Sequence, residues 1–470
     1  MSILALDIGS SRIKALLATL DGQLIEVRST STPRRSNEVG EHAYPADAVQ
    51  DAIEGLIAGM AAAWPRQPIR TLVFSCLGTA MVPVDGRGRP LGPALAPADR
   101  RPLEGPGVAE AVDMSPVELR DRTGCDPAVA SSLLHFLWWW RTKPEVMADL
   151  HRFRSLRGFA IQELCGADAE DATWASRTML VDLDTNRWSG AILDAAGLPA
   201  AALPPIEPAT TALPVRRSAV ARLGLAPGAA ALLGAMDNCC SFLGAADIER
   251  SDLVNIVGTY EHMAGVASLA EVREVAGASG AIVHTYVMPD CYIAMTRVAL
   301  GELLALAAGG DLTRLDHLLD AVSATPRGDA IALTPEAVTE AICAGVPPAR
   351  ILQALLESES VVLRRFVDAW PGDGSRRPIA AVGGGASHPA VLQLKANLLG
   401  HPLSTLATDE AAGIGALRLA AMTTQSMSSS EASRVFPNPS VRTYYPTAGA
   451  TGPSRGMARP SVSTPTHGGA

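Results

Sequence analysis

The stretch that decides the fold lies near the start of the chain and reads ILALDIGSSRIK, from Ile3 to Lys14. An apolar run, a turn of small residues and a second apolar run that continues to Leu20 predict two antiparallel strands. Asp7 stands at the end of the first strand, beside a turn that no large side chain shields. Such a turn can wrap an anion, and a carboxylate beside it can hold a hydrated divalent cation. The residues alone also allow a surface hairpin in which Asp7 only hydrogen-bonds its own turn.

The composition indicates a large soluble α/β protein. A chain of 470 residues exceeds one hydrophobic core and predicts two large domains. With 48% apolar and 19% charged residues, it can fill buried sheet and helix layers. The net charge of -9, with no basic stripe to offset it, argues against nucleic acid and anionic membranes as partners. Because we find neither a signal-like segment nor a run of about 18 apolar residues, we expect a cytoplasmic protein.

The cysteines are predicted to be buried thiols. They are seven in number, scattered, and without metal-ligand spacing (positions 76, 125, 165, 239, 240, 291 and 343). Cys239 and Cys240 are adjacent, but a redox pair is the less favoured interpretation of them.

The first half of the chain is predicted to alternate strands and helices. Asp21-Gly22 between apolar runs predicts a second hairpin. Further elements expected from periodicity are a strand at 71–76 and helices at 46–64, 131–141, 154–165 and 188–197. The proline-rich run at 199–214 resembles a linker. His135, in the predicted helix at 131–141, is interpreted as an interior side chain whose hydrogen bonds are satisfied.

Polar residues in this half are candidates for binding a sugar. Asp99 and Arg101 lie in a proline-bounded loop, where the carboxylate can accept hydrogen bonds from hydroxyls and the guanidinium can donate to them, although such charges are usually just solvated. Trp174, in a predicted polar loop at 171–178, is either a packing residue or an apolar platform for a sugar face. Asp237 follows a predicted strand at 230–236, and a role as the N-cap of the next helix would by itself explain it.

The second half repeats the pattern of the opening stretch. Residues 253–266 predict a strand, a Gly258-Thr259 turn and a second strand, which suggests a duplicated architecture with both turns facing one triphosphate. Residues 378–389 predict a strand, a turn of three glycines and a helix. Three glycines favour a close approach by a base or ribose, although tight strand–helix packing would also accept them.

The remaining elements of the second half are helices. They are expected at 295–308, 311–324, 348–370 and 411–422. The last of these is predicted to close the folded part, because the chain beyond Tyr445 has almost no large apolar residues and should be disordered.

In their order and spacing, these motifs resemble those of the FGGY carbohydrate kinases over roughly residues 2–446. The resemblance is carried by LALDIGSSRIKALL, PALAPADRR, DATWASRTMLVDLDTNRWS, GAMDNCCSFLGA, IVGTYEHM, AVGGGASHP and ANLLGHPL. It implies a duplicated, two-domain α/β fold of the actin-like ATPase (ribonuclease H-like) type, with a catalytic cleft between the domains. The domains are expected at 1–246 and 247–446, followed by a disordered tail at 447–470.

The resemblance also implies an ATP-dependent carbohydrate kinase that uses Mg²⁺. Asp237 matches the family's catalytic base, and Asp7 matches the aspartate that holds Mg²⁺. The residues matched to ATP binding are Ser10, Ser11, Lys14, Gly258, Thr259, Gly384, Gly385 and Ser387. A base is needed because a sugar hydroxyl is a poor nucleophile until a carboxylate accepts its proton.

Local differences from family members narrow the range of expected substrates. Where xylulokinases carry Gly-Gln-Met-His-Gly, this chain has CLGTA at 76–80, and the Arg-Glu pair usual in glycerol kinases is absent as well. The GTYE motif at 258–261 is similar to the Gly-Thr-Trp-Glu of L-fuculokinases, so a ketopentose or deoxyketohexose is expected. The residues expected to contact the sugar are Thr79, Asp99, Arg101, Trp174, Asp237 and His262.

One segment departs from the family pattern. Members usually carry Pro-Tyr-Leu-x-Gly-Glu-Arg-x-Pro in the second domain, whereas residues 324–335 are shorter and lack it. This leaves open an altered dimer contact, a more open site or weakened catalysis. The alternatives to a sugar kinase are therefore a sugar- or nucleotide-binding regulator on the same fold and a polyol kinase. The partner is expected to be a small sugar, and a homodimer is left open.

Overall fold

The computed structural model describes residues 1–37, 40–128, 132–246, 252–258, 260–372, 377–408 and 410–447. These residues form two compact units. Unit 1 comprises Met1–Gly244, His284–Cys291 and Ala412–Pro437, and unit 2 comprises Ala245–Val283, Tyr292–Ala411 and the chain from Asn438. The division at residue 244 lies close to the predicted boundary, but two later segments also belong to unit 1. Thr259 and residues 448–470 of the predicted tail lie outside the described residues.

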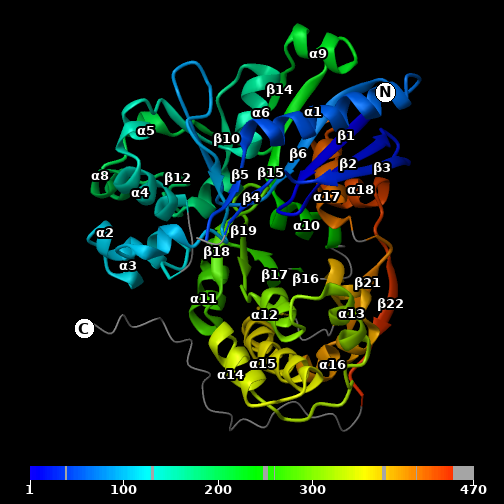
Figure 1. Ribbon diagram of the computed structural model, residues 1–470. Coiled ribbons are helices and arrows are strands. Elements are labelled where there is room, and N and C mark those ends of the chain that lie inside the picture. The colour runs from blue at the N-terminus through cyan, green and yellow to red at the C-terminus, as the bar shows by residue number, and fades with distance from the viewer. Residues whose placement is uncertain are drawn as a thin grey trace. The chain divides into compact units, whose positions relative to one another are not determined.

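Unit 1 is built on a six-stranded sheet (Figure 1). Its strands, in spatial order, are β14 (Ala212–Pro214), β15 (Ala230–Met236), β6 (Ile69–Cys76), β1 (Ser2–Ile8), β2 (Arg12–Thr19) and β3 (Leu24–Ser31). β1 pairs antiparallel with β2 and parallel with β6, and β15 pairs parallel with β6. The opening hairpin is confirmed, and the Gly9 N–H donates to the Arg12 carbonyl at 3.1 Å in its turn.

Smaller sheets and helices surround this sheet. The short strands are β4 (Arg35–Ser36), β5 (His42–Tyr44), β7 (Met81–Val84), β8 (Ala94–Leu95), β9 (Arg152–Ser155), β10 (Glu170–Asp171), β11 (Val181–Asp182), β12 (Arg187–Trp188) and β13 (Ile206–Glu207). The helices are α1 (Ala46–Ala63), α2 (Val108–Ala111), α3 (Pro116–Thr123), α4 (Ser132–Thr142), α5 (Pro144–Ala148), α6 (Leu156–Cys165), α7 (Ala172–Ala175), α8 (Gly190–Ala196), α9 (Arg217–Leu223), α10 (Asp237–Ala245), α17 (Ala411–Thr424) and α18 (Ser429–Val435). Short 3₁₀ turns are η1 (Arg101–Glu104), η2 (Ser176–Thr178) and η3 (Ala200–Ala202).

Both faces of the central strands are covered, which explains their nearly continuous apolar sequence. Leu4 and Leu6 of β1 belong to a buried cluster with Ile53 and Ile57 of α1. α17 packs on the same unit, because a Cβ placed on its Gly415 would lie only 1.8 Å from the Cys240 carbonyl oxygen. This backbone contact explains why residues 412–437, predicted in the second domain, belong to unit 1.

Three local predictions in unit 1 need correction. The segment 154–165 begins as strand β9, and only its later part is helix α6. The segment 199–214 is not a linker, because it supplies β13 and β14, and β14 pairs antiparallel with β15. The segment 171–178 is not a polar loop, since it forms the buried turns α7 and η2. In each case the pairing or burial comes from residues distant in sequence, which local composition does not report.

Unit 2 is built on a seven-stranded sheet with a related strand pattern. In spatial order its strands are β18 (Ile282–Thr285), β19 (Tyr292–Met295), β17 (Glu261–Ala267), β16 (Leu253–Val257), β20 (Ile379–Val382), β21 (Leu403–Leu406) and β22 (Ser440–Tyr444). β16 pairs antiparallel with β17 and parallel with β20, as β1 does with β2 and β6. β21 then continues in parallel, as β15 does. The duplication predicted from the two hairpins is therefore present in the strand pairing.

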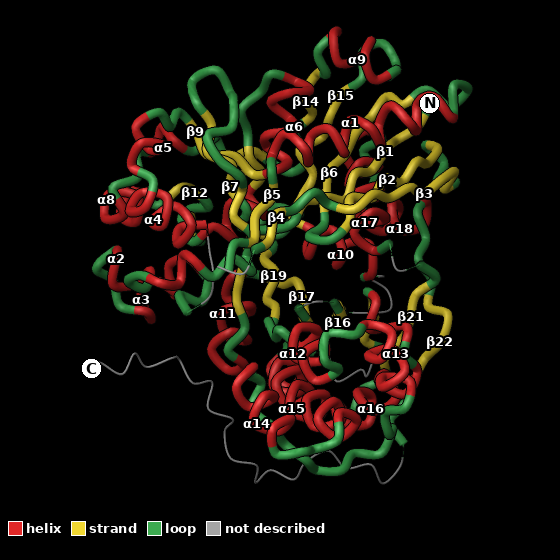
Figure 2. Tube along the Cα trace, viewed as in Figure 1, coloured by secondary structure: helices red, strands yellow, loops and turns green. Residues whose placement is uncertain are grey.

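Helices gather beside this sheet (Figure 2). They are α11 (Leu269–Ser279), α12 (Leu300–Ala307), α13 (Leu312–Asp320), α14 (Pro335–Cys343), α15 (Pro348–Ala369) and α16 (Pro389–Leu399), with a 3₁₀ turn η4 (Gly384–Ser387). The helix predicted at 295–308 starts only at Leu300, because Met295 ends β19 and Val298 forms an isolated antiparallel bridge with Glu261. The helix predicted at 411–422 is present as α17 but does not end the fold, since α18 and β22 follow it.

The segment that departs from the family pattern is an ordered loop held by α15. The N–H groups of Arg327 and Gly328 each donate to the Glu357 carboxylate at 2.8 Å, and the Ile331 N–H donates to Ser358 Oγ at 3.0 Å. Side chains of one helix thus satisfy the loop's backbone donors.

No helix among the described residues is both long and apolar enough to span a membrane. The prediction of buried thiols holds for Cys76, Cys125, Cys239 and Cys240. It is wrong for Cys343, which is exposed near the end of α14.

Candidate active site

Three neighbouring parallel strands of unit 1 bring the predicted catalytic residues to one edge of the sheet. Asp7 of β1 lies opposite Ser75 of β6, and Met236 of β15 lies opposite Cys76. Because parallel strands end on the same side, Asp7, the turn after Cys76 and Asp237 follow one another along this edge. The carboxyl ends of parallel strands are the usual place for ligand sites in α/β sheets.

The Asp7 carboxylate is held by its neighbours. Buried Ser75 Oγ donates to Asp7 Oδ1 at 2.7 Å. Lys14 lies directly opposite Asp7 in the β1–β2 pairing, and Ser10 and Ser11 are exposed in the turn between the strands. Four residues predicted to hold Mg²⁺ and ATP phosphates are thus at one end of one hairpin. Their contact with ligand stays a prediction.

Asp237 occupies the first position of α10 rather than the predicted cap, so the helix begins one residue early. Asp237 Oδ1 accepts the Asn238 N–H at 2.8 Å, and the residue keeps part of its surface exposed. Burial of the carboxylate and, after it, the charge of Asp7 raise the pKa of Asp237 to about 7, against the opposing effects of the Asn238 N–H and Arg177. A carboxylate with this pKa is suited to accept a proton near neutral pH.

A buried hydrogen-bond chain supports the backbone next to Asp237. Asp171 caps α7 by accepting the Thr173 N–H at 2.8 Å, and it also accepts the Thr173 hydroxyl. Thr173 Oγ1 in turn accepts the N–H of Met236 at 2.8 Å. Fully buried Arg157 forms ion pairs with Glu170 and Asp171 and so helps to hold the Asp171 carboxylate in place. Sequence reasoning missed this support, although an aspartate two residues before a threonine is a recognisable capping pattern.

The predicted sugar-binding pair Asp99 and Arg101 is in contact, but the two residues bind each other. Arg101 Nε and Nη2 donate to the Asp99 carboxylate at 3.0 and 2.7 Å, and the His42 N–H donates to it at 3.0 Å. Asp99 is 1% exposed. The Arg101 guanidinium lies 4.7 Å from the ring centroid of Trp138 in α4.

Thr79 and Trp174 lie at the end of β6. Thr79 is 2% exposed with a positive φ of 68°, and its carbonyl accepts Ser132 Oγ at 2.9 Å. Trp174 is also 2% exposed, and its Nε1–H donates to the Leu77 carbonyl at 3.1 Å. The structure therefore accounts for Trp174 as a packing residue, and its contact with a sugar stays a prediction.

In unit 2, the predicted adenosine turn packs against the strand that precedes the second phosphate turn. Gly383 has a φ of +92°, and a Cβ there would lie 2.4 Å from the Val257 carbonyl oxygen. A Cβ on Gly385 would lie 2.3 Å from Val257 Cγ1, whereas one on Gly384 would meet open space. Close packing alone thus requires two of the three glycines, and only Gly384 is left open toward a ligand.

The other candidates of unit 2 differ in exposure. Exposed Ser387 donates its hydroxyl to the Gly384 carbonyl at 2.7 Å, and Gly258 is also exposed. His262 is buried in β17, where its Nδ1 donates to the Thr296 carbonyl. A contact of His262 with the sugar stays a prediction.

A buried ion cluster lies directly after the second phosphate turn. Lys395 of α16 pairs with Glu261, the first residue of β17, and with Glu359 of α15 at 3.3 Å. Asn255 Nδ2 donates to Glu261 at 2.8 Å. Burial and then the charge of Glu261 raise the pKa of Glu359 well above its usual range, which favours its neutral form. Burial would lower the pKa of Lys395, but the two carboxylates together raise it.

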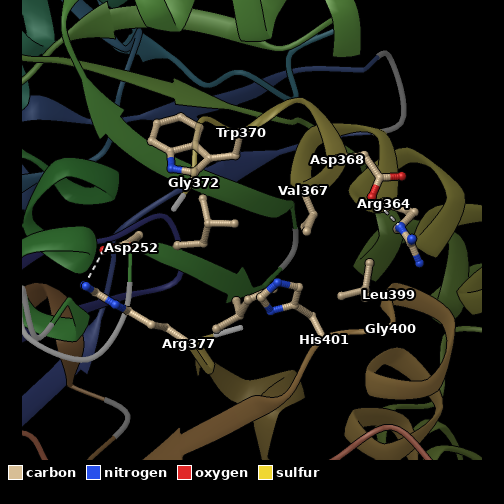
Figure 3. A pocket seen from close by; sticks show the side chains of 12 residues that line it. Asp252, Arg364, Val367, Asp368, Trp370, Gly372, Arg377, Leu399, Gly400 and His401 are labelled. Atoms are coloured by element: carbon tan, nitrogen blue, oxygen red, sulfur yellow. Dashed lines mark hydrogen bonds and ion pairs between the residues drawn. The ribbon is translucent and has the colours of Figure 1, made fainter. Parts of the chain in front are cut away.

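A separate cavity of about 310 Å³ lies in unit 2 (Figure 3). Trp370 and His401 line it, with the ion pairs Arg377–Asp252 at 3.1 Å and Arg364–Asp368 at 2.7 Å. It reaches Leu253 and Ile379, the first residues of β16 and β20, whereas the glycine turns follow the last residues of these strands. This cavity is therefore at the opposite edge of the sheet from the predicted nucleotide turns.

The residues at the β1 and β15 ends fit a magnesium ion. The charge of Asp7 raises the pKa of Asp237, so a bound cation would favour the ionised form of Asp237, and Asp7 is held in place by Ser75. Among the described residues, no group of three or more acidic, histidine or cysteine side chains could hold a metal. The single held carboxylate of Asp7 suits Mg²⁺, which is typically bound by one or two carboxylates together with substrate phosphates and water.

Comparison with known families decides the classification. The N-terminal domain of the FGGY family of carbohydrate kinases matches residues 2–244, and the C-terminal domain of the same family matches residues 328–424. The chain belongs to the FGGY family of carbohydrate kinases. As a member, it is an enzyme that uses ATP to phosphorylate a sugar or polyol.

Individual sugar kinases are similar to the chain, two of them over most of its length and one over less than half. The xylulose kinase of Lactococcus lactis subsp. lactis (strain IL1403) is 24% identical over 445 residues, which is 89% of this chain and 87% of that protein. The gluconate kinase structure from Lactobacillus acidophilus superposes with a TM-score of 0.80 at 18% identity, covering 96% of this chain and 94% of that one. The L-fuculokinase of Salmonella typhi is 23% identical over 210 residues, 43% of each chain. These FGGY relatives bear different substrate names, so the match alone leaves the substrate open.

Proposed function

We propose that this FGGY kinase transfers the γ-phosphoryl group of ATP to a hydroxyl of a ketose, with Asp237 as the general base. The observation that carries the proposal is the Asp237 carboxylate, with its pKa raised to about 7 beside Asp7 at the carboxyl ends of adjacent parallel strands. A helix-capping role would need neither the burial of the Asp237 carboxylate nor the neighbouring charge of Asp7. A base that works near neutral pH needs the raised pKa that both of them produce.

The chain's own residues divide the work of the reaction. Asp237 accepts the proton of the attacking hydroxyl, and the Asp171–Thr173 chain holds the Met236 N–H and thereby the start of α10 in place. Asp7 would hold Mg²⁺, which when bound neutralises charge on the transferring phosphoryl group. The hairpin turn at Ser10 and Ser11 and the Gly258 turn donate backbone N–H groups to ATP phosphates, and Gly384 leaves room for the adenosine.

The preference for a ketose is supported by the GTYE motif at 258–261, which is similar to that of L-fuculokinases. The test of this preference is an assay of Mg-ATP-dependent ADP release over a panel of compounds. The panel contains the ketoses L-fuculose, L-rhamnulose and D-xylulose, the aldose L-fucose, the sugar acid D-gluconate and the polyol glycerol. We expect at least one ketose to give the highest kcat/KM. A polyol or an aldose as the best substrate would contradict the ketose assignment, and no sugar-dependent ADP release with any ketose, aldose or polyol would contradict the proposed function itself.

The pKa of Asp237 predicts the pH dependence of the reaction. The base must be ionised, so kcat/KM for the sugar should fall about tenfold per pH unit below the pKa of Asp237 and reach a plateau above it. Mg²⁺ on Asp7 offsets the second cause of the raised pKa and leaves burial, the larger one, so this limb should lie below about pH 7 but well above the pKa near 3.9 of an unperturbed aspartate. Steady-state rates between about pH 5 and 9 measure it, and a flat profile down to pH 5 would contradict the assigned pKa.

A further inference from the structure

The backbone that leads into the second phosphate turn is fixed by the predicted adenosine turn. Val257 ends β16 and directly precedes Gly258. A Cβ on Gly383 would lie 2.4 Å from the Val257 carbonyl oxygen, and one on Gly385 would lie 2.3 Å from Val257 Cγ1. The two predicted nucleotide turns of unit 2 are therefore in direct backbone contact at the start of the phosphate turn.

The backbone that leaves the phosphate turn is held by the helix that follows the adenosine turn. α16 carries Lys395, which forms an ion pair with Glu261, the first residue of β17. Asn255 of β16 also donates its side-chain N–H to Glu261 Oε1 at 2.8 Å. One continuous segment, residues 383–399, thus contacts the chain on both sides of Gly258.

The main chain at Glu261 does not need this ion pair to stay in the sheet. The Glu261 N–H donates to the Val298 carbonyl at 2.7 Å, and the Val298 N–H donates to the Glu261 carbonyl at 3.0 Å. Lys395 and Glu261 are both fully buried. Because burying two charges costs solvation that their attraction often only offsets, apolar side chains of similar size could fill this space as stably. What a hydrogen-bonded ion pair adds is a fixed geometry between the two backbones that it joins.

We propose that Lys395 and Glu261 are positioning residues for ATP, whose ion pair holds the second phosphate turn at a fixed distance from the adenosine turn. This inference rests on the proposed function, in which both turns bind ATP. A backbone N–H binds a phosphate oxygen only within a narrow range of distance and angle, so a nucleotide that contacts both turns needs them at one separation. Because both side chains are fully buried, neither touches the nucleotide itself.

Glu359 allows this role to be separated from stability. Its carboxylate lies 3.3 Å from Lys395, and burial and then the charge of Glu261 raise its pKa. In Glu261→Met that charge is gone, so Glu359 can ionise and remain the partner of Lys395. Asn255 keeps the His262 carbonyl, to which its side-chain N–H also donates at 3.2 Å. The variant therefore leaves no buried charge unpaired, and it removes only the ion pair between α16 and β17.

Glu261→Met is expected to raise the Kd of Mg-ATP about 10- to 100-fold, which is what the loss of one hydrogen bond to a charged phosphate costs. The KM for the best sugar of the panel should stay within about twofold, because β17 holds no part of the base. Glu261→Gln keeps an oxygen that can accept from Lys395 and Asn255, so it should recover part of the affinity. Calorimetric titration with Mg-ATP measures Kd without turnover, and urea unfolding measures the stability of each variant.

Val338→Ala is the matched control. Val338 is fully buried in α14 of the same unit, in a hydrophobic cluster away from both turns. This variant should lower stability and leave the Kd of Mg-ATP within about twofold. A Kd for folded Glu261→Met equal to that of the wild type would overturn the proposal, and so would an equal rise in Val338→Ala.

If Glu261→Met does not fold, Glu261→Gln decides in its place. A Kd of Mg-ATP raised above that of Val338→Ala supports the proposal, and a Kd equal to that of the wild type overturns it. A wild-type protein that binds no Mg-ATP and shows no sugar-dependent ADP release would instead refute the proposed function.

Discussion

Replacement of Asp237 by asparagine is expected to lower kcat by about 10²- to 10⁴-fold, the range that general base catalysis contributes. Asparagine keeps the size of the side chain, and its amide oxygen can still accept the Asn238 N–H that Asp237 accepts at 2.8 Å. It cannot take up a proton from the sugar hydroxyl. The variant should therefore fold and bind ATP as the wild type does, and only the transfer step should fail.

Asp194→Asn is the matched control for Asp237→Asn. Asp194 is an exposed aspartate on α8 of the same unit, and its replacement makes the same change of charge. We expect it to leave kcat within about twofold. Steady-state kinetics and ATP titration of both variants measure the difference, and a kcat for Asp237→Asn close to that of Asp194→Asn would remove Asp237 as the base.

Replacement of Lys395 by methionine is expected to destabilise the protein by about 3–5 kcal/mol. Methionine fills a similar volume but leaves Glu261 as a buried charge without its partner, since Lys395 and Glu261 are both almost fully buried. Because Glu261 is the first residue of β17, the loss should also disturb the second phosphate turn. Urea unfolding monitors the stability, and KM for ATP should rise in whatever fraction stays folded.

Replacement of Glu359 by glutamine, in the same ion cluster, is expected to leave the stability nearly unchanged. The raised pKa of Glu359 favours the neutral form, so a neutral isostere is expected to change stability by less than about 1 kcal/mol. If Glu359→Gln destabilises the protein as strongly as Lys395→Met, Glu359 is ionised and the charge assignment of the cluster is wrong.

Local patterns of apolar and small residues predicted the strands, turns and helix that carry the candidate site residues. The opening hairpin, the second hairpin at 253–266 and the strand, glycine turn and helix at 378–389 are all present, because each depends on neighbouring residues whose apolar spacing and small turn residues are visible locally. The resemblance to the family implied roles for Asp7 and Asp237, and the strand pairing places both at one edge of the sheet.

Long-range contacts account for what the sequence did not predict. The packing of Gly415 on the Cys240 backbone brings α17 into unit 1 across a large separation in sequence, and no local pattern encodes it. Burial converts charged residues such as Lys395 and Arg157 from expected surface groups into core ion clusters.

The central claim is that the phosphoryl group moves from ATP to a sugar hydroxyl with Asp237 as base. Its most direct test follows the label from γ-phosphoryl-labelled Mg-ATP in the presence of the best sugar of the panel, in the wild type and in Asp237→Asn. The account predicts labelled sugar phosphate equal in amount to the ADP formed by the wild type, and almost none from the variant over the same time. ADP formation without labelled sugar, or equal labelling by both proteins, would contradict it.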